Sequence, residues 1–178
     1  MMNDFNLIIA GFGGQGVLFS GKVVAYAGLI DEKEVSWLPS YGPEMRGGTA
    51  NCSICISENA IGSPLITNPN ALIAMNLPSL EKFISDVQTG GLIIVDSSLI
   101  DVKIDREDVK VCYVPATKLA EEHEVSGLAN IILIGKLLKE TQFATKETIH
   151  KAIEKCVPAS KERMINFNKQ AIEIGFDY

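Results

Sequence analysis

The fold is decided by the stretch Phe5-Asn6-Leu7-Ile8-Ile9-Ala10-Gly11-Phe12-Gly13-Gly14-Gln15-Gly16 and by the apolar run Val17 to Ala25 that follows it. An apolar run, a glycine cluster and a second apolar run predict a buried strand, a tight turn and a helix. The glycines fit the spacing G-x-G-x-x-G. Because they carry no Cβ, backbone N–H groups of the turn can approach an anion, with the positive end of the helix behind them. Alone, the motif indicates only that an anionic or closely packed group approaches the turn.

Length and charge limit the possible functions. The 178 residues predict one domain covering the whole chain, enough to bury roughly 70% of its unfolded surface. A net charge of −6 argues against nucleic-acid binding. No apolar run approaches the roughly 20 residues of a membrane span, and no basic region precedes the first one as in a signal peptide. We therefore expect a cytoplasmic protein that binds neither nucleic acid nor a membrane.

Two of the four cysteines form a C-x-x-C pair, Cys52 and Cys55, which raises the question of a metal or cluster site. The surrounding residues, Asn51 to Ser57, read as a strand, in which positions three apart face opposite sides of the sheet. A zinc or Fe–S site also requires further ligands, and the sequence offers no second pair. We expect buried structural thiols and no metal ligands.

The remaining pattern predicts a three-layer α/β/α domain that is Rossmann-like, with a mostly parallel mixed sheet and one antiparallel strand pair. No helix separates 34–38 from 49–57, so these strands are expected to pair antiparallel, with Pro39 ending the first. The connection 97–108 is expected to be solvated, and Thr145 and Ser160 to cap helices. The other expected strands are 5–10, 71–75, 92–95 and 109–114, and the expected helices are 17–29, 76–87, 117–123, 126–140, 146–156 and 161–175.

Two nucleotide-binding interpretations fail on particular residues. A dinucleotide site needs an acid at the end of the second strand, where this chain has Pro39 and Ser40 instead. The run from Gly16 to Lys22 fits the P-loop spacing, but Val23 stands where a Mg²⁺-binding Ser or Thr is required.

Groups that could perform catalysis alone are scarce. His123 and His150 lie in charged helical segments and are expected to be solvated. Asp96 at a strand end is the best single candidate, but capping of the next turn explains it equally well. We assign no catalytic residue and no metal ligand.

The segment from Ser40 to Gly48 is too long and too rich in large side chains for a plain hairpin turn. Tyr41, Met45 and Arg46 are residue types that are enriched where surfaces become buried against a partner. Arg46 also offers five fixed donors to a carboxylate or phosphate. An exposed loop whose aromatic side chain packs on the sheet is the alternative, and we favour an interface or ligand loop.

Several motifs, in this order, resemble the gamma subunits of 2-oxoacid:ferredoxin oxidoreductases, in particular the 2-oxoglutarate (2-ketoglutarate) type. The resemblance runs from about Asn6 to Phe176 and weakens over 101–108 and after Thr141. The motifs that carry it are Gly11-x-Gly13-Gly14-Gln15-Gly16-Val17-Leu18, the run Ser40 to Cys52, Ile61-Gly62-Ser63-Pro64, Ala74-Met75-Asn76 with Pro78-Ser79-Leu80, and Val114-Pro115-Ala116-Thr117.

The resemblance implies one part, domain III, of a multisubunit enzyme that converts a 2-oxoacid and CoA to an acyl-CoA and CO₂, with two electrons passing to ferredoxin. It places thiamine diphosphate and Mg²⁺ on alpha and beta subunits, and Fe–S clusters on beta or a small delta subunit. This chain is then expected to bind no cofactor alone and to face its partners. The expected cofactor-binding or interface residues are Gly11, Gly13, Gly14, Gln15, Gly16, Tyr41, Gly42, Glu44, Met45, Arg46, Gly47, Gly48 and Asn76.

Alternatives stay open at this point. The oxoacid could be pyruvate or a branched-chain oxoacid, since specificity would lie mainly on other chains. The subunit could be purely structural, its glycine turn serving only close packing, and in isolation it could form a homodimer. The last alternative is a free-standing nucleotide-dependent enzyme. Val23 counts against it, and so do the acids Asp31, Glu32 and Glu34, which come before the end of the second strand.

Overall fold

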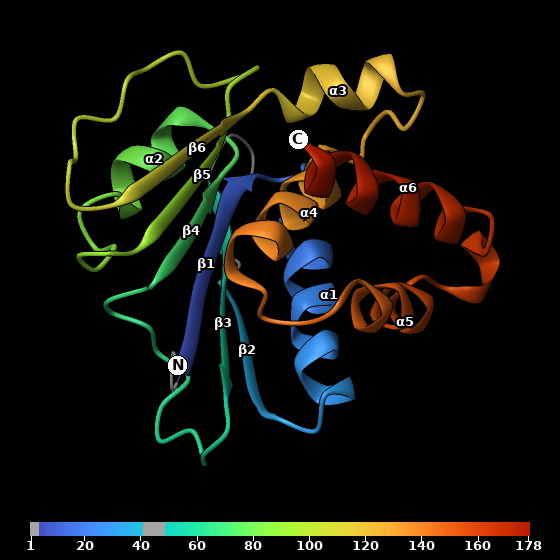
Figure 1. Cartoon of the computed structure of the whole chain (residues 1–178), viewed down its shortest axis with the longest axis horizontal. Helices are drawn as coiled ribbons and strands as arrows, with labels where there is room; N and C mark the ends of the chain where they lie inside the picture. The colour runs from blue at the N-terminus through green and yellow to red at the C-terminus, as the bar shows by residue number, and fades with distance from the viewer. Residues whose placement is uncertain (1–3, 41–48) are drawn as a thin grey trace.

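A computed structural model describes residues 4–40 and 49–178 of the chain. Within them, one mixed sheet has the strand order β2-β3-β1-β4-β5-β6 (Figure 1). Strands β1, β4, β5 and β6 run parallel to one another, whereas β3 runs antiparallel to both of its neighbours, β1 and β2. The strands are β1 (Asp4–Phe12), β2 (Glu34–Ser40), β3 (Thr49–Ser57), β4 (Ala71–Ala74), β5 (Leu92–Asp96) and β6 (Lys110–Val114).

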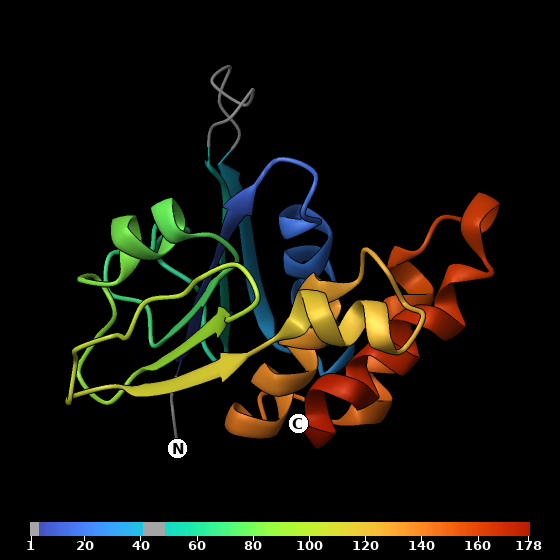
Figure 2. The same ribbon diagram turned by 90° about the horizontal axis from the view of Figure 1, so that it is seen from above.

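Helices cover the sheet unequally. Figure 2 shows most of them on one side, with α2 on the other. The expected α/β/α class with a mostly parallel sheet is confirmed, and the predicted antiparallel pairing of β2 with β3 is present. The helices are α1 (Val17–Ile30), α2 (Leu77–Phe83), α3 (Ala116–Glu122), α4 (Ala129–Thr141), α5 (Lys146–Cys156) and α6 (Met164–Asp177), with a 3₁₀ turn at Ala159–Lys161.

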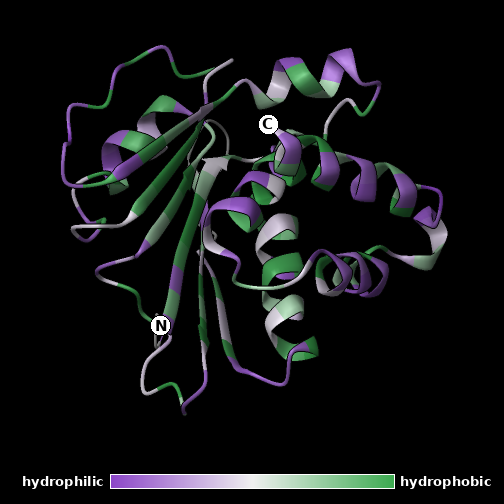
Figure 3. Cartoon of the chain, viewed as in Figure 1, coloured by the Kyte–Doolittle hydropathy of each residue, from purple (hydrophilic) through white to green (hydrophobic). Residues whose placement is uncertain are grey.

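Two apolar clusters lie on the two sides of the sheet. Leu7 and Ile9 of β1 belong to the larger cluster, which the helices α1 and α4 share, while Ile8 and Ala10 belong to the smaller cluster beneath α2. Strands buried on both faces read as continuous apolar runs, which is why the first strand shows no alternation in the sequence. Figure 3 shows the hydrophobic residues concentrated on the central strands and hydrophilic ones along much of α5 and α6.

Close contact between α4 and α6 depends on glycine. A Cβ added at Gly175 of α6 would overlap the backbone carbonyl of Ile132 in α4, and one at Gly135 of α4 would overlap the carbonyl of Ile172. The two helix backbones therefore pack against each other with no side chain between them at these points.

Two boundary predictions were wrong. Pro39 does not end the second strand, because β2 is an edge strand in which a missing N–H can face away from the sheet, and pairing continues to Ser40. The helix predicted to reach Val87 ends at Phe83. The Arg106 guanidinium donates to the carbonyls of Ile84 (2.7 Å) and Val87 (2.9 Å), which replaces further helical bonding there.

The last helix and the long connection also differ from expectation. Ser160 lies in a 3₁₀ turn and caps nothing, since α6 begins at Met164 without a side-chain cap. The connection 97–108 is only partly solvated, because Ile100 and Ile104 are buried in the smaller cluster. The Thr145 cap is confirmed: its Oγ1 accepts a hydrogen bond from the Thr148 amide at 3.0 Å.

Candidate functional site

The glycine turn lies where the connections from neighbouring strands pass to opposite sides of the sheet. The chain leaves β1 into α1 on one side of the sheet and leaves β4 into α2 on the other side (Figure 2). In open α/β sheets, ligands bind in the crevice that this divergence leaves at the carboxyl ends of the strands. The glycine motif 11–16 ends β1 and begins the turn at this edge, so the crevice beside it is the expected ligand position.

The Gln15 side chain bridges this crevice. Its Oε1 accepts a hydrogen bond from the Phe12 amide at 2.6 Å, and its Nε2 donates to the Met75 carbonyl at 3.1 Å. The amide thus joins the end of β1 to the residue after β4. A Cβ at Gly11 would lie 2.7 Å from Gln15 Oε1, so the first glycine provides room for this side chain. A nucleotide phosphate entering the crevice would have to displace it.

The last glycine of the motif packs against α4. Gly16 adopts the left-handed conformation with φ of 75°, and a Cβ there would overlap the Asn130 amide nitrogen. Asn130 is buried, and its Nδ2 donates to the Gly16 carbonyl at 3.0 Å. Sequence reasoning missed this role of Asn130, although a polar residue inside the apolar run 128–134 was a usable signal.

The outer part of the turn remains accessible. Gly13 and Gly14 are exposed, and nothing lies within 4 Å of a Cβ added at Gly14. Clefts flank the turn on both sides. One of about 220 Å³ lies beside Gln15 and Met75, and one of about 320 Å³ runs from Phe12 over the first turn of α1. The accessible surface of the motif is therefore a ridge between two shallow clefts.

The second predicted site segment begins and ends beside this ridge. The last residue of β2, Ser40, pairs with Asn51, and the first residue of β3, Thr49, pairs with Phe12. Both strand ends therefore lie at the edge that carries the glycine turn. The predicted site residues of this segment lie outside the described residues: Tyr41, Gly42, Glu44, Met45, Arg46, Gly47 and Gly48.

Asn76 lies at the same edge and acts as a helix cap. Its Oδ1 accepts a hydrogen bond from the Ser79 amide at 2.8 Å at the start of α2, and its side chain is buried. Within the described part of the chain, its Nδ2 has no hydrogen-bond partner. The local role of Asn76 is to start α2.

The remaining candidate groups have structural partners. Asp96 is fully buried and accepts hydrogen bonds from the Ser98 amide at 3.1 Å and from the Thr117 hydroxyl at 2.5 Å, so its capping role is confirmed. His123 is exposed, as predicted. His150 is not simply solvated: it is half-buried, and its Nε2 lies 3.2 Å from a Glu173 carboxylate oxygen.

Comparison with known proteins identifies the family. The family model described as pyruvate ferredoxin/flavodoxin oxidoreductase matches residues 6–178. The chain belongs to this family. The ketoisovalerate oxidoreductase subunit VorA of Methanothermobacter marburgensis is 36% identical over 170 residues, which cover 96% of this chain and 35% of VorA. The 2-oxoglutarate synthase subunit KorC of Methanocaldococcus jannaschii is 34% identical over 166 residues, which cover 90% of this chain and 89% of KorC.

The chain thus spans about a third of VorA but nearly all of KorC. A solved structure agrees with this assignment. The gamma subunit of keto/oxoacid ferredoxin oxidoreductase from Geobacter sulfurreducens PCA superimposes with a TM-score of 0.83 at 28% identity, covering 97% of this chain and 96% of that one. The resemblance to gamma subunits of this family is confirmed.

The cysteines of this family member do not fit an Fe–S cluster, which needs several thiolates directed at one point. Cys52 belongs to the cluster beneath α1 and donates to the Val17 carbonyl at 3.5 Å, while Cys55 faces the opposite side, as predicted. Burial raises the pKa of the Cys52 thiol to about 12, far from thiolate formation. Over 4–40 and 49–178, no group of three or more His, Cys, Asp or Glu side chains is placed to hold a metal ion, and no helix is long and apolar enough to cross a membrane.

Proposed function

We propose that the whole chain is one domain, acting as the gamma subunit of a multisubunit 2-oxoacid:ferredoxin oxidoreductase with 2-oxoglutarate as its oxoacid. The complex would convert 2-oxoglutarate, CoA and oxidised ferredoxin to succinyl-CoA, CO₂ and reduced ferredoxin. Similarity to KorC over about nine-tenths of both chains supports this assignment. Thiamine diphosphate with Mg²⁺ and the Fe–S clusters would be held by alpha, beta and delta subunits, and the complex as a whole would act in the cytoplasm.

The observation that carries this proposal is the Gln15 amide in the crevice between β1 and β4. The Gln15 amide bridges the end of β1 and the residue after β4 at the usual nucleotide position of an open α/β sheet, and Gly13 and Gly14 are the exposed ridge of the motif. A ridge with shallow clefts beside it suits contact with another protein surface better than enclosure of a small ligand. The subunit would then shape a site whose reactive groups lie on its partners.

Arg46 would be the charged contact at this edge. The segment that contains it joins β2 to β3, and both of these strands end at the edge of the sheet that carries the glycine turn. A guanidinium can bind a carboxylate or a phosphate through two parallel hydrogen bonds, and 2-oxoglutarate, CoA and thiamine diphosphate all present such groups. We therefore assign Arg46 to the thiamine and CoA environment of the assembled enzyme.

The branched-chain oxoacid is the second candidate substrate, favoured by the 36% identity to VorA. Purification of the co-expressed complex, followed by viologen reduction with CoA and each oxoacid in turn, separates the candidates. We expect 2-oxoglutarate to give the highest kcat/KM. A preference for 2-oxoisovalerate or pyruvate would overturn the substrate assignment without affecting the subunit assignment.

Arg46→Ala separates an active-site role from a purely structural one. The expected result is normal assembly with a raised KM for the oxoacid or for CoA, because a lost charge-assisted contact weakens substrate binding. Arg163→Ala, at the exposed start of α6, is the matched control. Loss of assembly with normal kinetics in the complexes that do form would support a structural subunit, and unchanged assembly and kinetics would remove the proposed role of Arg46.

A further inference from the structure

In the described structure, no helix covers the side of β2 and β3 that faces away from α1, over residues 36–40 and 51–53. Cross-strand pairs lie on the same side of a sheet, so the pairs Leu38 with Ser53 and Ser40 with Asn51 face one way together with Ser36. We call these five residues the β2–β3 face. Cys52 and Ile54, which alternate with them, face the opposite way and pack beneath α1. The helix on the same side as the β2–β3 face, α2, contacts β1 and β4 instead (Figure 2).

The composition of this face is unusual for a surface in water. Its members are three serines, one asparagine and one leucine, all exposed or half-buried, and none carries a charge. The register places two exposed acids, Glu34 and Asp4, further along the same side of the sheet, so the uncharged part is the end of this side nearest the glycine turn. Exposed strands normally carry charged residues that discourage association, whereas the centres of protein interfaces are depleted in them. The uncharged, small side chains make a flat surface that another protein can approach closely.

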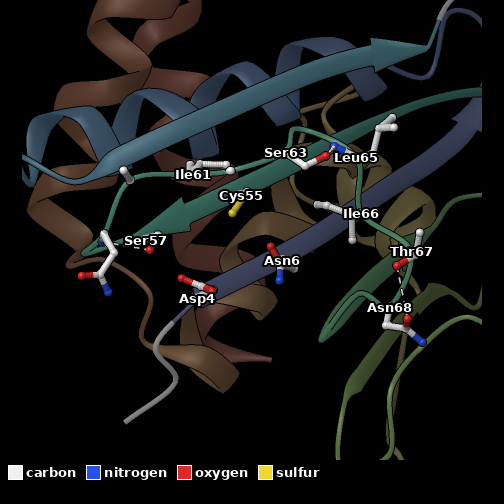
Figure 4. Close-up of a pocket in the computed structure, with 13 residues that line it drawn as sticks. Asp4, Asn6, Cys55, Ser57, Ile61, Ser63, Leu65, Ile66, Thr67 and Asn68 are labelled. Carbon is white, nitrogen blue, oxygen red and sulfur yellow. Dashed lines mark hydrogen bonds between the residues drawn. The ribbon is translucent and has the colours of Figure 1, made fainter.

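Apolar side chains extend this face at two ends. Phe12, on the same side of the neighbouring strand β1, is 39% exposed, and Leu65 in the segment after β3 is 70% exposed, more than any other large hydrophobic residue of the described chain. Figure 4 shows this segment crossing β3 and β1, with Leu65 pointing away from Asn6 and Cys55. Asn6 and Cys55 line a groove of about 410 Å³ beneath the segment. Cys55 of β3 pairs with Ser36 of β2. The face and the segment therefore adjoin at this strand pair.

We propose that the β2–β3 face, with Leu65 at its margin, docks the companion chain that corresponds to the remaining two thirds of VorA. This inference rests on the proposed function. In VorA, sequence like this chain accounts for 35% of the polypeptide, so the rest of the same polypeptide is available to pack against the domain. The occupant is a protein surface that is itself uncharged where it meets the serines, since an unpaired charge buried there would cost more than the contact gains.

Cysteine labelling tests this directly. All four native thiols are buried, and burial raises the pKa of each, so an introduced surface cysteine reacts selectively with a maleimide. Ser36→Cys and Leu65→Cys place a thiol at the centre and margin of the surface, and Asn166→Cys on exposed α6 is the control. In the complex, at subunit concentrations about tenfold above the dissociation constant, the first two should label roughly tenfold more slowly than in the free subunit. The control should label equally in both.

A charge at the centre of the face provides a second readout. Ser53→Arg should lower recovery of the co-expressed complex roughly tenfold or more, because a buried, unpaired guanidinium is strongly unfavourable, while Asn166→Arg should have no effect. Thermal unfolding of each free variant checks that it is folded. If Ser53→Arg does not fold, the labelling experiment still tests the docking surface.

The outcomes distinguish the two proposals. A complex that forms with unchanged labelling at Ser36→Cys and Leu65→Cys overturns the docking surface and leaves the proposed function standing. Protection that appears in the free subunit as its own concentration rises identifies a second copy as the occupant, which also overturns the proposal. If the wild-type chain joins no companion subunits, both proposals fall.

Discussion

Replacing Gln15 by alanine tests whether its amide holds the carboxyl edge of the sheet together. The substitution removes the 2.6 Å bond from the Phe12 amide and the 3.1 Å bond to the Met75 carbonyl. A hydrogen bond of this kind contributes about 0.5–1.5 kcal/mol net, and both groups gain partial access to water when the side chain is lost. We therefore expect the free energy of unfolding to fall by about 1–2 kcal/mol. For a chain of this size, that corresponds to a decrease in Tm of about 2–8 °C.

The assay is urea unfolding of the isolated subunit, followed by circular dichroism. A lower midpoint at unchanged slope means lost stability rather than altered compactness. Gln88→Ala is the matched control, because this exposed glutamine makes no side-chain hydrogen bond within the described residues. An unfolding midpoint of Gln15→Ala equal to that of the control would refute the claim that the Gln15 amide joins the ends of β1 and β4.

Gln15→Glu adds a pH dependence whose sign the geometry sets. A carboxylate can accept from the Phe12 amide, but its second oxygen would face the Met75 carbonyl oxygen, and two acceptors repel. Once protonated, the carboxyl group can donate to that carbonyl as the native amide does. The folded state therefore favours the protonated form, so the variant should lose stability relative to wild type as pH rises from about 5 to 8. A difference that is constant over this range would contradict the assigned bond to Met75.

Three further substitutions test the surrounding structure. Gly175→Ala places a Cβ against the Ile132 carbonyl of α4 and should lower the free energy of unfolding in urea by about 3 kcal/mol or more. Gly62→Ala, which has open space around it, should cost little. Equal effects of the two substitutions would contradict the backbone contact between α4 and α6. Thr145→Ala removes the cap of α5 and should cost about 1 kcal/mol, and a serine at this position should restore most of it. The hydrogen bond from Arg106 lowers the pKa of Asp108 to about 2, so the stabilisation by this carboxylate is present above its unfolded pKa of about 4 and is lost as pH falls towards 2. The stability difference between wild type and Asp108→Asn should shrink over that interval, and a difference independent of pH would exclude the ion pair.

The sequence predicted local structure well where the signal is itself local. The glycine turn between two apolar runs located β1 and α1, and the short connection after β2 required an antiparallel partner. The cap of α5 followed from Thr145 preceding an amphipathic run. Each of these features depends on residues close together in the chain.

The functions of the glycine motif could not be predicted in the same way. The G-x-G-x-x-G spacing is compatible with two kinds of turn. One binds an anion, and the other packs closely against side chains of the same protein. Which of these forms here depends on Gln15 reaching a carbonyl 60 residues away and on Asn130 reaching Gly16 across 114 residues. The early end of α2 likewise depends on Arg106, about 20 residues further along the chain. The proposed contacts of Arg46 stay a prediction from sequence.

The central claim is that this chain completes an enzyme whose reactive groups lie on other subunits. The most direct measurement is viologen reduction by the companion subunits with 2-oxoglutarate and CoA, before and after this chain is added. The account predicts no turnover by the chain alone, little by the companions alone, and full activity when they are combined. Equal kcat and KM with and without this chain, or turnover by the chain alone, would contradict it.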